Sequence, residues 1–141
     1  MFVEIGHFFL AIALSVSMLQ FILPIIGLKL NSNRSMAASI YSSYVYFLLI
    51  LASFISLMWA YISSDFSVLL VANNSHSLKP LIYKITGVWG NHEGSLMLWV
   101  LILAGYGAAL SLTGKHLPLK IKSTVLSIQG LIAIAFTSFI L

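Results

Sequence analysis

A short run near the middle of the chain carries most of its chemically active residues. Trp89–Ser95 reads Trp-Gly-Asn-His-Glu-Gly-Ser, and Trp99 follows within an apolar stretch. A histidine next to a glutamate can bind a metal, shuttle a proton or hydrogen-bond a carboxylate. The simpler interpretation is that both side chains only fix the start of the next helix by hydrogen bonds. The residues that we expect to act together are Trp89, Gly90, His92, Glu93, Gly94, Ser95 and Trp99.

Outside this run, the sequence offers few reactive groups. Glu4 and His7 stand one helical turn apart near the N-terminus, while His76 and His116 fall in polar stretches and are expected to face solvent. The chain has no cysteine, which excludes disulfides, thiolate metal sites and a cysteine nucleophile. It also lacks a phosphate-binding glycine loop, a His-Glu-x-x-His helix and a nucleophile elbow. We therefore assign no catalytic residue and no metal site.

The elements that position these residues follow from composition. Hydrophobic residues make up 60% of the chain and charged residues 7%, against about 25% charged in a typical soluble domain. A membrane span needs about 20 apolar residues, and a helix satisfies its own backbone hydrogen bonds in lipid. The sequence predicts an all-α, polytopic membrane helix bundle. Its four expected transmembrane helices are 3–28, 41–62, 94–113 and 123–141.

The basic residues predict the orientation of these helices. Lys29 and Arg34 lie between the first two spans, and Lys115, Lys120 and Lys122 lie between the last two, without any acid. Short loops rich in lysine and arginine stay on the cytoplasmic side. We expect the N-terminus, the 63–93 segment and the C-terminal end to face outward. We therefore attribute the net charge of +4 to the loop residues that set the orientation in the membrane. The sequence does not indicate a nucleic-acid partner.

The segment between the second and third spans is expected to lie on the outer membrane surface. It is too polar to span the bilayer and too apolar for a solvated loop, so we expect short extended or helical pieces. Asn73-Asn74-Ser75 and Lys79-Pro80 are turn signals. The candidate residues of this outer segment are Asp65, Asn74, Ser75, Pro80 and Tyr83.

Aromatic and helix-breaking residues refine the span limits. Amphipathic rings favour the headgroup level, so Tyr41, Tyr44 and Tyr46 are expected at the inner end of the second span. Trp59 and Tyr61 are expected at its outer end. Pro24 is expected to kink or end the first span, and Ser95 to cap the third.

Two features predict contacts between helices. Gln20 is buried by position and is expected to hydrogen-bond a neighbouring helix, and the third span offers a small-residue packing face. That face comprises Gly105, Gly107, Ala108 and Ala109. The fourth span ends without a polar flank, which suggests that the chain is a portion of a longer protein.

The central run resembles the signature of the CcmF family, the cytochrome c maturation (haem lyase) membrane proteins. The upstream segment and the opening of the chain follow the same family in the same order, so the resemblance covers the whole chain. Besides the central run, the matching residues are Glu4–His7, Asp65–Val68, Val71-Ala72, Asn74-Ser75, Leu78, Pro80 and Tyr83-Lys84.

The resemblance implies that residues 1–141 form the N-terminal transmembrane region of a larger protein. Such a protein takes haem from the haem chaperone CcmE and joins it to apocytochrome c, with a CcmH-type thiol partner, at the outer face of the membrane. The membrane is then the bacterial inner membrane or the mitochondrial inner membrane, and the related NrfE branch fits as well as CcmF. The family's tryptophan-rich haem segment and haem ligands lie beyond this chain, so we expect it not to catalyse thioether formation alone.

Two other function classes stay open on the residues alone. An ion- or proton-translocating subunit would also string apolar helices together, but it normally places ionisable relay residues in mid-span. A structural scaffold of a membrane complex would need no reactive site at all.

Overall fold

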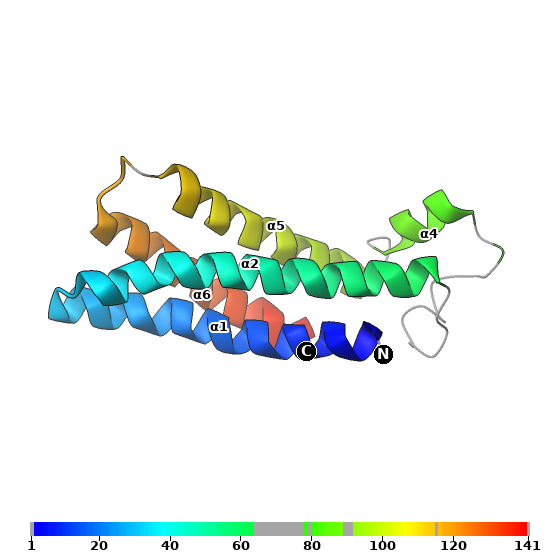
Figure 1. The fold of residues 1–141 in the computed structure, drawn as a ribbon, viewed down its shortest axis with the longest axis horizontal. Coiled ribbons are helices and arrows are strands. Elements are labelled where there is room, and N and C mark those ends of the chain that lie inside the picture. The colour runs from blue at the N-terminus through cyan, green and yellow to red at the C-terminus, as the bar shows by residue number, and fades with distance from the viewer. Residues whose placement is uncertain (1, 64–77, 79, 89–91, 115, 141) are drawn as a thin grey trace.

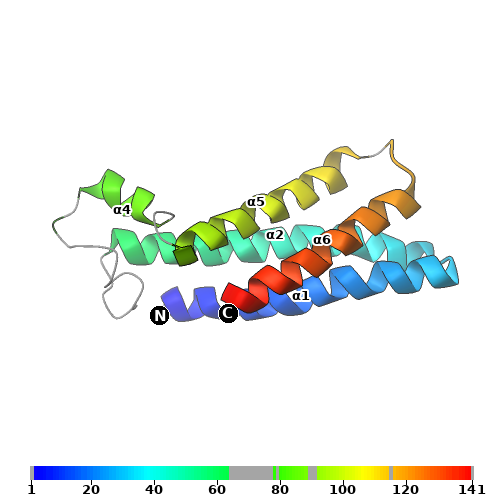
Figure 2. The same ribbon diagram turned by 180° about the vertical axis from the view of Figure 1, so that it is seen from behind.

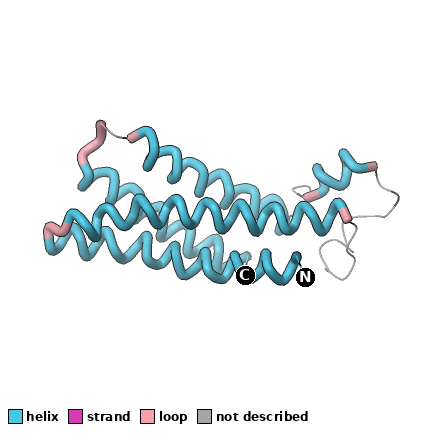
Figure 3. Tube along the Cα trace, viewed as in Figure 1, coloured by secondary structure: helices cyan, strands magenta, loops and turns pink. Residues whose placement is uncertain are grey.

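A computed structural model describes residues 2–63, 78, 80–88, 92–114 and 116–140, with the backbone alone for 2–3 and 92–93. Within these residues the secondary structure is helical (Figure 3). The four long helices are α1 (Phe2–Leu30), α2 (Asn33–Ile62), α5 (His92–Thr113) and α6 (Leu119–Ile140), and α4 (Leu81–Gly87) is short. All four long helices are long and apolar enough to cross a membrane, which confirms the predicted fold class of a polytopic helical bundle.

A tight turn makes α1 and α2 an antiparallel pair. Asn31 adopts φ 51°, a left-handed conformation that asparagine tolerates better than most residues. The Ser32 N–H then donates to the Gly27 carbonyl at 2.9 Å, which ends α1, and the Ser32 side chain caps the first turn of α2. Helix α2 therefore begins at Asn33, eight residues before the predicted start of the second span.

The bundle has two distinct ends (Figures 1 and 2). We call the turn end the one that holds the α1–α2 turn, the end of α5 and the start of α6. The opposite end, here the motif end, holds the start of α1, the end of α2, α4 and the start of α5, and α6 runs back toward it. This up-and-down arrangement places the start of the third span beside the N-terminus of the chain, as the predicted topology requires.

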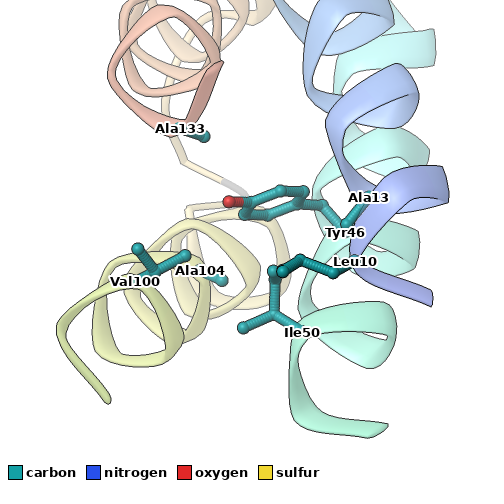
Figure 4. Packing of buried hydrophobic residues seen from close by; sticks show 7 residues of the cluster. All are labelled: Leu10, Ala13, Tyr46, Ile50, Val100, Ala104 and Ala133. Carbon is teal, nitrogen blue, oxygen red and sulfur yellow. The ribbon is translucent and has the colours of Figure 1, made fainter. Parts of the chain in front are cut away.

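The hydrophobic core is built by all four long helices. Leu10 and Ala13 from α1, Tyr46 and Ile50 from α2, Val100 and Ala104 from α5 and Ala133 from α6 form one buried cluster (Figure 4). The Tyr46 hydroxyl and Thr137 Oγ1 are 2.7 Å apart, which satisfies the phenol within the core. The prediction that Tyr46 marks the inner membrane boundary is therefore wrong, because α2 starts earlier and carries Tyr46 into the bundle.

A chain of side-chain amides joins α1, α6 and α5. Gln20 Nε2 donates to the Leu126 carbonyl and to Gln129 Oε1, each at 2.9 Å, and Gln129 Nε2 donates to the Leu103 carbonyl. The prediction that Gln20 is buried and bonds to a neighbouring helix is confirmed. Pro24, by contrast, is buried inside α1 and does not end it, since the helix continues to Leu30.

Candidate functional site at the motif end

A second buried cluster fixes the backbone around the predicted motif. Phe54, Ala60 and Tyr61 from α2 pack with Val88 and with Met97 from α5. Val88 is fully buried although it follows a short exposed helix, and Ile140 at the end of α6 packs against the same cluster. The chain is therefore anchored to α2 immediately before the motif begins.

The structure places the motif residues in three ways. Trp89 and Gly90 lie outside the described residues, and His92 and Glu93 supply the first backbone positions of α5. Gly94 is buried and Ser95 is half-buried within the first turn of α5. Because the helix begins at His92, Ser95 lies inside it, and the prediction that Ser95 caps it is wrong. Trp99 is 63% exposed and faces the surroundings of the bundle.

The outer segment is described only near its end. Asp65, Asn74 and Ser75 lie outside the described residues. Pro80 precedes α4 with φ −57° and ψ 150°, an extended conformation that proline favours at a helix start. Tyr83 lies on α4 and is exposed. The expectation of a short helical piece is thus confirmed for Leu81–Gly87.

The start of α1 is held at the same end. Ser53 Oγ donates to the Gly6 carbonyl at 2.9 Å, and a Cβ added at Gly6 would come within 2.7 Å of the Ser56 Cβ. This close approach leaves Glu4 and His7 exposed on the outside of α1. The motif end therefore gathers the predicted N-terminal pair, α4 and the start of α5, although they lie far apart in the sequence.

The described residues do not gather into a cluster of metal-binding side chains. No group of three or more histidine, cysteine or acidic side chains lies together among them. His7 is at the motif end, whereas His116 is exposed at the turn end, the length of the bundle away. Two imidazoles on opposite ends cannot ligate one iron axially, so we derive no chemistry of a bound haem from these residues.

The sequence analysis did not predict the contacts that Lys122 and Gln129 make between helices. Lys122 was expected in a loop, but α6 begins at Leu119 and buries it, and its ammonium donates to the Ser111 carbonyl at 2.9 Å. A cation there complements the carboxyl end of α5. Pro118 immediately before α6 was the available signal, because proline favours helix starts. For Gln129 the signal was an amide in the middle of an apolar span.

Comparison with known proteins gives a consistent result. The chain is 49% identical over 141 residues to the cytochrome c-type biogenesis protein CycK of Rhizobium meliloti and covers 21% of it. It is 37% identical to the cytochrome c-type biogenesis protein CcmF of Haemophilus influenzae, over its whole length and 22% of that protein. A solved structure of the cytochrome c haem lyase CcmF superposes with a TM-score of 0.91 at 28% identity, over 98% of this chain and 23% of that one.

No protein-family model matches the chain. It spans about a fifth of the length of the curated relatives it matches.

Proposed function

This chain belongs to the CcmF family of cytochrome c-type biogenesis proteins and corresponds to their N-terminal portion, and we propose that it takes part in delivering haem to apocytochrome c and attaching it covalently. The single observation that carries the proposal is that sequence and fold agree over the whole chain. An identity of 49% to a biogenesis protein and a TM-score of 0.91 to a haem lyase come from independent comparisons.

We propose that the motif end faces the outer side of the membrane, where apocytochrome c arrives. Five of the seven lysines and arginines lie in or beside the turn end, and the three acids, Glu4, Asp65 and Glu93, lie elsewhere in the sequence. Cations retained on the cytoplasmic side would set this orientation. The protein is an integral membrane protein, and the proposed membrane is the bacterial inner membrane or its mitochondrial counterpart.

In this proposal, haem is the substrate and the motif end is a docking surface. The exposed Trp99 ring and the motif residues Trp89, His92 and Glu93 would contact the haem edge or a partner. The partners would be the haem chaperone CcmE, a CcmH-type thiol protein and apocytochrome c. Anchoring by Val88 and by the Ser53–Gly6 hydrogen bond supports this role, because a docking surface gains affinity when its backbone is fixed in advance.

The buried polar groups favour this proposal over proton translocation. Among the described residues they are serines, one threonine, Gln20 and Lys122. A proton relay needs acidic or imidazole side chains within the membrane, and none of these groups is one. Most of them hydrogen-bond to another helix, as a rigid scaffold for a surface site would require, whereas Ser17, Ser39 and Ser123 bond to carbonyls of their own helix.

The direct test is the double variant His92→Ala/Glu93→Ala in the full-length protein. If each side chain contributes one polar contact worth about 1 kcal/mol, the double variant loses about 2 kcal/mol, and holocytochrome c should fall about thirtyfold. Holocytochrome is measured by its covalent haem, and the abundance of the variant by immunoblot.

The matched control is His116→Ala, which removes an exposed imidazole at the turn end. It should leave holocytochrome at the wild-type level. Wild-type holocytochrome in the double variant, with the variant present at normal abundance, would refute a role for the motif.

A further inference from the structure

The outward face of α4 is apolar, the reverse of what water would favour. Ile82, Tyr83 and Leu81 are 67%, 59% and 58% exposed, and Leu78 just before the helix is 86% exposed. Lys84 and Ile85, on the opposite side from Ile82 and Tyr83, are half-buried. A surface helix in water normally turns its charged residues outward and its apolar residues inward. The outward surroundings of α4 are therefore apolar.

The hydroxyl of Thr86, which lies on the same face of α4, does not need water as a hydrogen-bond acceptor. Thr86 Oγ1 donates to the Ile82 carbonyl at 3.0 Å and lies 3.3 Å from the Tyr83 carbonyl, so its proton stays within the helix. A hydroxyl that bonds back to its own helix can face an apolar phase at little cost. Ile82, Tyr83 and Thr86, with Leu78 just before the helix, form what we call the α4 face.

The position of α4 identifies which apolar phase it meets. Helix α4 packs against α2, and Val88 just after it joins Ala60 and Tyr61 in one cluster, so α4 lies beside the last turns of α2 (Figures 1 and 2). A helix of 30 residues is longer than the roughly 20 residues that cross the hydrocarbon. Trp59, which is half exposed in the second-last turn, favours the headgroup level, and Ser63, one turn further along, then lies on the aqueous side of it.

We propose that the α4 face lies in the interfacial layer of the lipid bilayer. Short helices with outward leucine, isoleucine and aromatic side chains bind at the boundary between headgroups and acyl chains. The lipid-exposed surface of α2, which includes Ile55 and Trp59, continues directly to this level.

This placement has a consequence for the motif. Val88 anchors the chain to the bundle directly after α4, and the α4 face anchors it to the membrane directly before. The two anchors would hold the start of α5 at the bilayer surface instead of in bulk solvent. A ligand of the motif would then be met at the membrane, which favours an amphipathic one.

Residues 1–141 contain no cysteine, so only cysteines elsewhere in the full-length protein have to be replaced by serine before the test. In the full-length protein in its membrane, Ile82→Cys places a thiol on the α4 face, and Ser63→Cys is the matched control, at an exposed position that ends α2. A charged, membrane-impermeant maleimide should modify Ile82→Cys about tenfold more slowly than Ser63→Cys, because interfacial burial shields the thiol. A fluorophore at Ile82→Cys should be quenched by lipids that carry a nitroxide near the headgroup.

Two results would overturn the proposal. Equal alkylation rates for Ile82→Cys and Ser63→Cys would place the α4 face in water. Slow alkylation without quenching by nitroxide lipids would show that protein covers it. Tyr83→Cys repeats the measurement at a second exposed position of the α4 face and should give the same pattern as Ile82→Cys. Neither result depends on haem attachment, so the outcome is separate from that of the motif variants.

Discussion

At the scale of single residues, the amide pair Gln20 and Gln129 is the most constrained feature of the bundle. Gln20 uses both N–H bonds, whereas its Oε1 is buried without a hydrogen-bond partner among the described residues. Gln129 Oε1 in turn accepts from Gln20. The two amides share one hydrogen bond and each also donates to a backbone carbonyl, so a change of either residue should affect the other.

Removing one amide should therefore cost more than removing both. Gln20→Leu leaves Gln129 Oε1 without its donor and should lower the free energy of unfolding by about 1 to 2 kcal/mol. Gln20→Leu/Gln129→Leu also removes the Gln129 amide, so no Oε1 is left without its donor. The double variant should therefore be closer to wild type. Unfolding in detergent, analysed as a double-mutant cycle, measures the difference.

Additive losses in that cycle would show that the two amides act independently. Each glutamine would then contribute to the free energy of unfolding separately from the other.

At the scale of elements, small residues decide how closely the helices approach. A Cβ added at Gly130 of α6 would come within 2.9 Å of the Phe21 backbone nitrogen and 3.1 Å of the Gln20 carbonyl carbon. At Gly107 of α5 it would overlap the Gln129 amide. The predicted small-residue face of α5 is thus used at Gly107 and Ala108, which are buried, while Ala109 is exposed.

Gly130→Ala should force α1 and α6 apart, because the atoms it meets belong to the backbone and cannot turn away. We expect a loss of about 1 to 3 kcal/mol in the free energy of unfolding. Gly105→Ala is the matched control, since its Cβ would be 3.5 Å from Phe47, an ordinary contact. That variant should be neutral or slightly stabilising, because alanine favours helix over glycine.

Thermal unfolding of the two variants in detergent, beside wild type, distinguishes them. Equal melting temperatures would contradict a close contact between α1 and α6 at Gly130.

At the scale of the whole molecule, charge is distributed unequally between the ends. Lys29 and Arg34 lie beside the α1–α2 turn, and Lys120 and Lys122 lie in the first turn of α6. Lys122 is buried among the helices while Lys120 is exposed, so the cations at this end are partly structural and partly available to solvent or lipid. This asymmetry is what the proposed orientation depends on.

Single-cysteine variants test that orientation. An impermeant thiol reagent added to the outer side of sealed membranes should modify Ser63→Cys at the motif end. It should modify His116→Cys at the turn end only after the membrane is permeabilised, because positively charged loops stay inside. Both positions are exposed, so access is decided by the side of the membrane alone. Labelling of His116→Cys in sealed membranes would reverse the proposed topology.

Much of the architecture could be predicted from local sequence properties. Apolar length predicted four spans, Pro80 and Pro118 stand immediately before α4 and α6, and the turn after Leu30 separates two helices. These features are local, because a span is set by the length of an apolar run and a helix start by the residue that precedes it. The location of the motif at the start of the third long helix followed in the same way.

Only the tertiary structure decided which side chains face the interior. Tyr46 was expected at a membrane boundary and Lys122 in a loop, but both are buried, and Gly130 proved to be a point of close approach between α1 and α6. The physical reason is that lipid is as apolar as a protein core, so hydrophobicity alone does not separate an inward face from an outward one. Packing and hydrogen bonds between distant helices make that distinction, and they exist only once the bundle has formed.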